Sequence, residues 1–177
     1  WGKRLGGTSN IQSNAIATDS NGNVYVTGIF GGSMTFDVEG GGTETLDSIG
    51  SYDMYVFKYD ANGNVLWGKR LGGTSFDQSN GIAPDSNGNV YVTGYFGGSM
   101  TFDVEGGGTE TLNSASADTN DIFVLKYGSN GNVLWGKRLG GTGSDYGNAI
   151  ATDSNGNVYV TGFFKESMTF DVEGGGT

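Results

Sequence analysis

The chain has 177 residues, of which 35 are glycine and one is proline, and it contains neither cysteine nor histidine. The absence of these two residue types excludes disulfides, structural zinc thiolates, iron–sulfur clusters and histidine-dependent catalytic sites. Nineteen acidic against nine basic residues give a net charge of −10, which disfavours nucleic acid and anionic lipid as partners, and no apolar run is long enough for membrane insertion.

The sequence consists of one unit that is repeated almost three times. The string WGKRLGGT begins at Trp1, Trp67 and Trp135, so the unit is 66 and then 68 residues long. Because a catalytic site needs different groups that converge once, groups present in every copy are better explained as structural. The expected organisation is two full repeat units, 1–66 and 67–134, followed by a partial unit, 135–177.

The first copy contains four short segments rich in β-branched and aromatic residues, which predict strands. An Asn-Gly turn joins the first two segments and another joins the last two, and this dipeptide is a strong hairpin signal. No segment keeps the 3.6-residue apolar period of a helix. The expected strands cover residues 15–18, 24–27, 54–59 and 65–67, and an extra hairpin has strands at 34–36 and 44–46.

The predicted strands carry large apolar groups on both faces. Val24 and Tyr25 point to opposite sides of one strand, and Val56 opposes Phe57 on another. In a sheet with one solvent-exposed face, apolar and polar residues would alternate along each strand. Each sheet is therefore expected to be covered on both sides. The predicted fold class is all-β, with β-propeller-type blades of about four antiparallel strands and an extra hairpin. Since propellers have about four to eight blades, this chain forms an incomplete ring, and it either belongs to a longer repeat protein or assembles with other copies.

The segments GGTGSDYGNAIATDSNGNVYVTG at 140–162 and DMYVFKYDANGNVLWGKRLGG at 53–73 resemble the bacterial SBBP β-propeller repeat family. The similarity recurs in every copy and covers essentially the whole chain. It implies β-propeller blades and an extracellular or cell-surface location in bacteria. It implies no catalytic motif that could be transferred to positions of this chain.

Several recurring motifs have structural explanations. The DSNGN turn at Asp19 lacks the glycine and glutamate spacing of an EF-hand, so its aspartate is expected to accept backbone N–H groups of the turn. The Lys3-Arg4 pair and its copies are expected to balance nearby carboxylates. Trp1 and its copies are expected to pack between blades rather than to stack on sugars. The glycines at 40–42 precede no predicted helix, so they indicate a turn rather than a phosphate-binding loop.

Each unit also has two carboxylates at i and i+2. In an extended segment both lie on one face, where they would suit Ca²⁺ with help from the carbonyls of the following glycines. Glycoside hydrolysis needs two carboxylates in different environments, whereas near-identical copies give equal environments. We expect solvated hairpin residues and no resident metal or other cofactor, with Ca²⁺ as the open alternative. The pairs are Asp37/Glu39, Asp103/Glu105 and Asp171/Glu173.

Differences between the copies concentrate at one edge of the predicted sheets. Antiparallel connection puts the Asn-Gly turns on one rim and the remaining connections on the opposite rim, which we call the variable rim. A rigid scaffold with variable loops is a common organisation of binding proteins. The candidate ligand-binding residues are Asn10, Ile11, Phe76, Asp77, Ser144, Asp145, Tyr146, Lys165 and Glu166.

The sequence therefore favours a non-enzymatic extracellular binding or adhesion scaffold, with a glycan or a protein as its ligand. A structural protein that self-associates through open blade edges, as a surface fibre or matrix component, is the alternative from a different class. A glycoside-active enzyme is a distant third.

Overall fold

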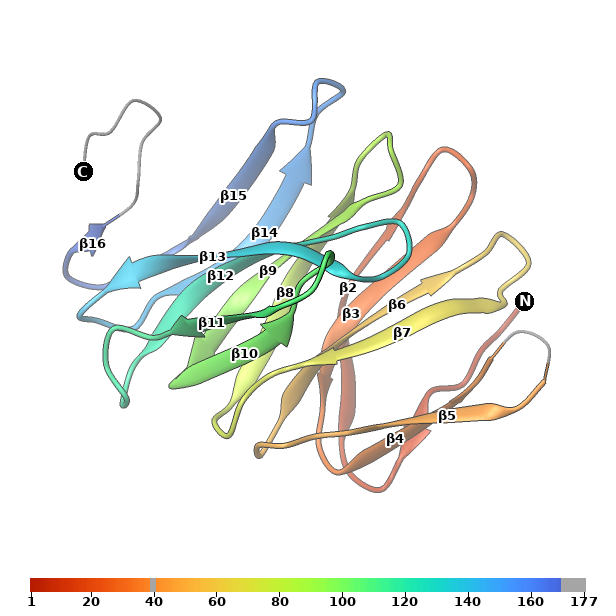
Figure 1. Cartoon of the computed structure of the whole chain (residues 1–177), viewed down its shortest axis with the longest axis horizontal. Coiled ribbons are helices and arrows are strands. Elements are labelled where there is room, and N and C mark those ends of the chain that lie inside the picture. Colours follow the sequence, from red (N-terminus) through yellow and green to blue (C-terminus); the bar gives the residue numbers. More distant parts are fainter. Residues whose placement is uncertain (39–40, 170–177) are drawn as a thin grey trace.

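The computed structural model describes residues 1–38 and 41–169, and it contains sixteen strands and no helix within those residues (Figure 1). The sheets stand side by side along the chain, as stacked blades do, and they do not close into a ring. The all-β, blade-type fold expected from the sequence is confirmed. Nowhere in the described ranges is there a helix long and apolar enough to cross a membrane.

The first blade is a four-stranded antiparallel sheet in the order of the chain. Across the sheet, the strand order is β2 (Ile11–Thr18), β3 (Val24–Phe30), β6 (Asp53–Tyr59) and β7 (Val65–Leu71). The extra hairpin lies between β3 and β6 in the chain and consists of β4 (Ser33–Asp37) and β5 (Thr43–Asp47), with β1 (Gly6–Gly7) paired to β4.

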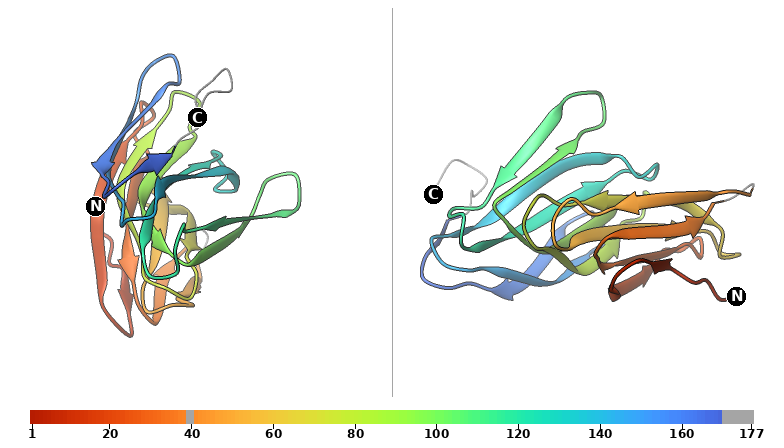
Figure 2. Two further views of the ribbon diagram at one scale, coloured as in Figure 1. Left: turned by 90° about the vertical axis from the view of Figure 1, so that its left-hand side faces the viewer. Right: turned by 90° about the horizontal axis from the view of Figure 1, so that it is seen from below.

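The second blade repeats this plan. Its sheet contains β8 (Asp77–Pro84), β9 (Val90–Gly97), β12 (Asn120–Tyr127) and β13 (Val133–Gly141), extended by β16 (Met168–Thr169). Its extra hairpin, β10 (Ser99–Asp103) with β11 (Thr109–Asn113), projects from the stack of sheets (Figure 2). The third unit contributes the pair β14 (Tyr146–Thr152) and β15 (Val158–Phe163).

An aspartate holds the Asn-Gly turns that begin at Asp19, Asp60, Asp85 and Asp153, whereas the β12–β13 turn has Gly128 in its place. The Asp60 carboxylate accepts the backbone N–H groups of Asn62 at 2.9 Å and Asn64 at 2.7 Å, and the Asn64 side-chain amide at 3.0 Å. These hydrogen bonds favour the ionised form and lower the pKa of Asp60. Gly63 supplies the positive φ of 84° that closes the turn. The structural explanation of this motif is therefore correct.

A β-bulge recurs in the first strand of each unit. In β8 the register shifts between Ser79 and Gly81, so Asn80 has no partner in β9. The side-chain amide of Asn80 donates to the carbonyl of Gly147 in the third unit at 2.8 Å. Asn14, at the same position of the first blade, donates to the carbonyl of Ser79 at 2.8 Å. The bulge thus turns a repeated asparagine into a polar link between consecutive blades.

Apolar side chains fill the space between the blades. Tyr25 and Val56 of the first blade belong to one buried cluster with Ile82 and Val92 of the second. A smaller cluster joins the second blade to the third unit. Both faces of the second blade are therefore covered, which explains why its strands lack an alternation of apolar and polar residues.

The first and third units each present a face that no described residue covers. Ile16 is 70% exposed, whereas Ile82 at the same position of the second blade is 6% exposed. At the other end, Tyr159 is 56% exposed, whereas the corresponding Tyr91 is 3% exposed. We call these surfaces the open faces, and each has the composition of a buried junction between blades.

Candidate functional site

The variable rim lies along one edge of the stacked sheets. In Figure 1 the turns that join β2 to β3, β8 to β9 and β14 to β15 are at the upper edge, and the loop from β7 to β8 is at the lower edge. Two hydrogen bonds fix this rim between units: the Asp77 N–H donates to the carbonyl of Tyr52 at 3.0 Å, and the Asp145 N–H to that of Asn120 at 2.7 Å. The backbone of the rim is therefore held in register across the blades.

Five aromatic side chains form a continuous row across the variable rim, which we call the aromatic row. Phe163 is 55% exposed, and the other four rings are half-buried. Contacts of this kind between rings fix their orientation while leaving part of each ring at the surface. Consecutive ring centroids are separated by 5.5 Å for Tyr52–Phe76, 6.0 Å for Phe76–Tyr95, 4.7 Å for Tyr95–Tyr146 and 6.3 Å for Tyr146–Phe163.

The aromatic row is made from positions that differ between the units. Where the second unit has Phe76, the others have Asn10 and Ser144. Tyr146 corresponds to glutamine in the first two units, and Tyr95 corresponds to isoleucine in the first and phenylalanine in the third. The repeated architecture alone therefore does not require these rings.

Each tyrosine of the aromatic row has an amide side chain beside its hydroxyl group. Each pair joins a ring to a polar side chain from another part of the chain, and none of the members carries a charge. The pairs are Asn10 Nδ2 to Tyr52 Oη at 3.4 Å, Tyr95 Oη to Gln78 Oε1 at 3.2 Å, and Asn120 Nδ2 to Tyr146 Oη at 3.4 Å. The site therefore combines apolar ring surface with neutral hydrogen-bonding groups.

Asp77 and Asp145 do not belong to the exposed surface, which corrects the prediction made for them. Both residues are fully buried beneath the rim. Asp77 Oδ2 accepts the N–H of Gly73 at 2.7 Å, and Asp145 accepts the N–H groups of Gly141 at 2.8 Å and Lys165 at 2.9 Å. Their carboxylates hold the loops in place from below.

A second buried carboxylate lies near each of these aspartates. Asp53 is fully buried and forms an ion pair with Arg70 at 2.7 Å. Gly72 passes between the two acids, because a Cβ at this position would be 2.7 Å from Asp53 Oδ1 and 2.9 Å from Asp77 Oδ2. Arg70 therefore balances a carboxylate, as expected for the Lys-Arg motif, whereas Arg4 of the first copy forms no ion pair with any described residue. The second blade has the same ion pair, between Arg138 and Asp121 at 2.5 Å.

Burial raises the pKa of Asp77 to about 6, and the nearby Asp53 carboxylate adds to this effect. A folded-state pKa above the ordinary value of 3.8 means that the native state binds the proton more tightly than the unfolded state does. The free energy of unfolding is therefore expected to fall as pH rises, by about 1.4 kcal/mol between pH 5 and pH 7 from this group. Urea unfolding across this range measures the fall, and Asp77→Asn should remove it. An equal fall in the variant would contradict the assignment.

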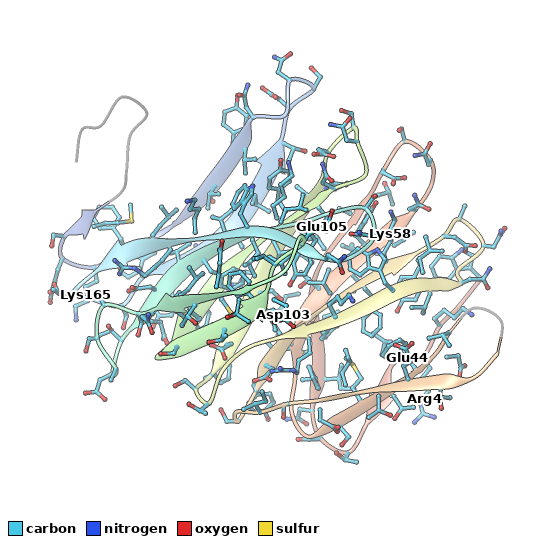
Figure 3. The ribbon with its side chains drawn as sticks, viewed as in Figure 1. Arg4, Glu44, Lys58, Asp103, Glu105 and Lys165 are labelled. Atoms are coloured by element: carbon cyan, nitrogen blue, oxygen red, sulfur yellow. The ribbon has the colours of Figure 1, made fainter. Side chains whose placement is uncertain are left out.

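Lys165 and Glu166 give the third unit a charged end of the rim (Figure 3 labels Lys165). They stand where the other units have consecutive glycines. Glu166 keeps the positive φ of those glycines, 67°, and its carboxylate accepts the hydroxyl of Thr142 at 2.9 Å. A non-glycine residue in this conformation is uncommon, so the exposed pair is a departure from the repeat rather than part of it.

The remaining predicted residues differ in their exposure to solvent. Asn10 is exposed and contacts the aromatic row, whereas Ile11 is half-buried and packs on the core of the first blade. Ser144 is half-buried. Sequence reasoning missed Tyr52, Tyr95 and Phe163 as site residues, although the differences between units at these positions were a usable signal.

The paired carboxylates of the extra hairpins separate in the second unit. The Glu105 side chain points to the β12–β13 turn, where its carboxylate accepts a hydrogen bond from the side-chain amide of Asn130 at 2.9 Å (Figure 3). Asp103 instead lines a cavity together with Lys69. Glu39 and the third pair, Asp171/Glu173, lie outside the described residues. Within residues 1–38 and 41–169, no three His, Cys, Asp or Glu side chains are placed to hold a metal ion.

Trp1 and Trp67 contact the turn of the blade that follows them, whereas Trp135 contacts Tyr91 of its own blade, with 6.0 Å between ring centroids. Trp1 Nε1 donates to the carbonyl of Ala61 at 3.0 Å, and Trp67 Nε1 to that of Ser129 at 3.1 Å. Trp67 also stacks on Tyr127 with 6.1 Å between ring centroids. Trp67 therefore packs between two blades, as the repeat predicted.

Consecutive four-stranded antiparallel blades with repeated junctions define a β-propeller-type repeat protein. Three segments, 1–28, 66–95 and 134–162, match the SBBP family model, described as a beta-propeller repeat. The chain therefore belongs to the SBBP β-propeller repeat family.

Two curated proteins are similar to the chain. An uncharacterized WD repeat-containing protein of Acanthamoeba polyphaga mimivirus is 31% identical over 157 residues, which cover 86% of this chain and 11% of that protein. Regulatory protein FlaEY of Caulobacter vibrioides is 35% identical over 123 residues, which cover 70% of this chain and 13% of that protein. The chain thus spans only about a tenth of the length of these relatives. Because one of them is viral, the restriction to bacteria is not borne out.

Proposed function

We propose that the chain is a non-enzymatic binding scaffold that acts outside the cell or at its surface and recognises its ligand through the aromatic row. The observation that carries the proposal is the continuity of this row over three units at positions where the units differ. Aromatic side chains with a polar tip supply contact area at low entropic cost, and binding surfaces are enriched in them. The relatives' names denote repeats and regulation, which fits binding better than catalysis.

Exchange of the loop residues that precede the first strand of each unit tests this proposal. Residues 8–10, 74–76 and 142–144 are replaced by Gly/Ser, and retention of the labelled chain on whole cells and on a panel of cell-surface proteins and glycans is measured. We expect retention to fall at least tenfold. A matched control changes exposed residues of the opposite rim, Ser20→Ala, Ser86→Ala and Ser154→Ala, and should retain binding. Unchanged retention after the loop exchange would reject the variable rim as the recognition surface.

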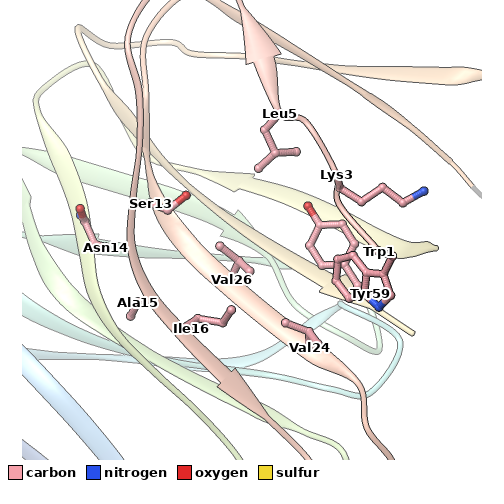
Figure 4. A pocket seen from close by; sticks show the side chains of 10 residues that line it. All are labelled: Trp1, Lys3, Leu5, Ser13, Asn14, Ala15, Ile16, Val24, Val26 and Tyr59. Carbon is pink, nitrogen blue, oxygen red and sulfur yellow. The ribbon is translucent and has the colours of Figure 1, made fainter. Parts of the chain in front are cut away.

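Self-assembly through the open faces is the second candidate function. The open face of the first blade contains a cavity of about 420 Å³ lined by apolar groups that include Ile16, Val24 and Val26 (Figure 4). At the next junction, Tyr25 and Val56 fill the corresponding space. Light scattering of the purified chain distinguishes the candidates: a discrete particle supports the binding scaffold, and open-ended growth supports the fibre.

A further inference from the structure

We infer that the ligand of the aromatic row is a neutral polysaccharide that lies along the row. This inference rests on the proposed function and adds the chemical class of the ligand. The row is continuous, and it extends from Tyr52 beside the first blade to Phe163 at the end of β15. A chain of several sugar units fits such a surface better than a single small molecule does.

The chemistry of the row matches that of a sugar ring. A pyranose has an apolar face of C–H groups, which stacks on an aromatic ring, and a rim of hydroxyl groups that both donate and accept hydrogen bonds. The rings of Phe76 and Phe163 supply apolar surface alone. Tyr52, Tyr95 and Tyr146 add a hydroxyl group, each within hydrogen-bond distance of an uncharged amide. These contacts are long, at 3.2–3.4 Å, so the amides are able to exchange them for ligand hydroxyls.

Charge distinguishes a neutral glycan from an anionic one. No member of the aromatic row and none of its three amide partners carries a charge, and the two aspartates beneath it are buried. The net charge of the chain, −10, repels a polyanion. Lys165 and Glu166 at one end of the row have opposite charges and give no net attraction to either sign.

Shape distinguishes a polysaccharide from a protein partner. Energetic hot spots of protein interfaces cluster at the centre of a patch around a well-packed pocket. Cavities on the open face of the first blade and beside the extra hairpins are lined by residues outside the aromatic row. The aromatic row offers ring surface at five consecutive positions, and a polymer that makes the same contact repeatedly suits it.

Affinity electrophoresis of the 177-residue chain tests the inference. The gels contain hydroxyethylcellulose or galactomannan as neutral probes, polygalacturonate as an anionic probe, or no polysaccharide. We expect retardation by at least one neutral probe and none by polygalacturonate. The double variant Phe76→Asn with Tyr146→Gln should weaken the binding at least tenfold, because it removes two stacking surfaces. Both replacements are residues that other units carry at these positions, so the fold is expected to accommodate them, and urea unfolding verifies this.

The open-face variant Ile16→Ser controls for adhesion through other exposed apolar groups and should bind as the parent chain does. Retardation that persists in the double variant, retardation by polygalacturonate alone, or no retardation by either neutral probe would overturn the inference. If the loop exchange abolishes retention on cells or proteins while these gels show no neutral-glycan binding, the proposed function stands and the polysaccharide assignment fails. If both experiments are negative, the proposed function fails as well.

Discussion

Replacing Gly94 with alanine is expected to cost about 3 kcal/mol or more of the free energy of unfolding, or to prevent folding. Gly94 lies in β9 opposite Ser79, at the place where the bulge of β8 begins. A Cβ at this position would overlap the carbonyl oxygen of Gln78, which is a backbone atom and cannot rotate away. Gly94 is fully buried within a paired strand, so relief requires the two strands to separate.

Urea unfolding of the Gly94→Ala variant measures this cost, with Gly81→Ala as the matched control. Gly81 lies in the paired strand β8, and the first and third units have alanine at its position. A Cβ there would meet Ile150 N at 2.9 Å, which is a milder conflict, and we expect a cost of about 1 kcal/mol. Equal effects of the two substitutions would show that the bulge does not determine the requirement for glycine.

The contrast between these glycines illustrates how far the sequence predicts the fold. The turns and strands depend on local chemistry, such as Asn-Gly dipeptides between β-branched residues, and they were predictable. The first strand was predicted at 15–18, but β2 begins at Ile11. The extension passes through the bulge at Asn14, which breaks the alternation of side chains that identifies a strand.

The candidate site was less predictable than the fold, because its contacts join distant parts of the chain. Differences between units located the variable rim, and Phe76 and Tyr146 were found in this way. Their common neighbour Tyr95 lies at the end of a strand whose other residues indicate core, so strand periodicity alone assigns it no role at the surface. The approach of Phe76 to Tyr52 depends on pairing between two units, which a single strand pattern does not specify.

Asp77 was predicted to be an exposed binding residue, but it is buried. Its position holds isoleucine in the first unit and aspartate in the others, which looks like the free variation of an exposed loop. In the structure this position points inward, beside Asp53 and Arg70. The N–H of Gly73 and the nearby Arg70 charge compensate the burial of Asp77. In the first unit Ile11 occupies this position and packs on the apolar core of that blade.

Replacing Arg70 with methionine is expected to destabilise the chain by about 3 to 5 kcal/mol, the range for removing one partner of a buried ion pair. The substitution retains most of the aliphatic stem and removes the charge. Asp53 is fully buried and accepts the N–H of Ile49 at 2.9 Å besides the Arg70 guanidinium at 2.7 Å. Without the arginine, two carboxylates remain buried on either side of Gly72 with no nearby cation among the described residues to balance them.

Thermal and urea unfolding at pH 7 measure this loss, and the repeat supplies its own control. Arg4 stands at the same position of the first unit but is exposed and forms no ion pair with any described residue, so Arg4→Met should change stability by no more than about 0.5 kcal/mol. Burial raises the pKa of Asp77 to about 6, and loss of the Arg70 charge favours its protonated form further, so the deficit of Arg70→Met should shrink as pH is lowered from 7 to 5. A loss equal to that of Arg4→Met, or one independent of pH, would mean that packing of the arginine stem and not its charge supports the rim.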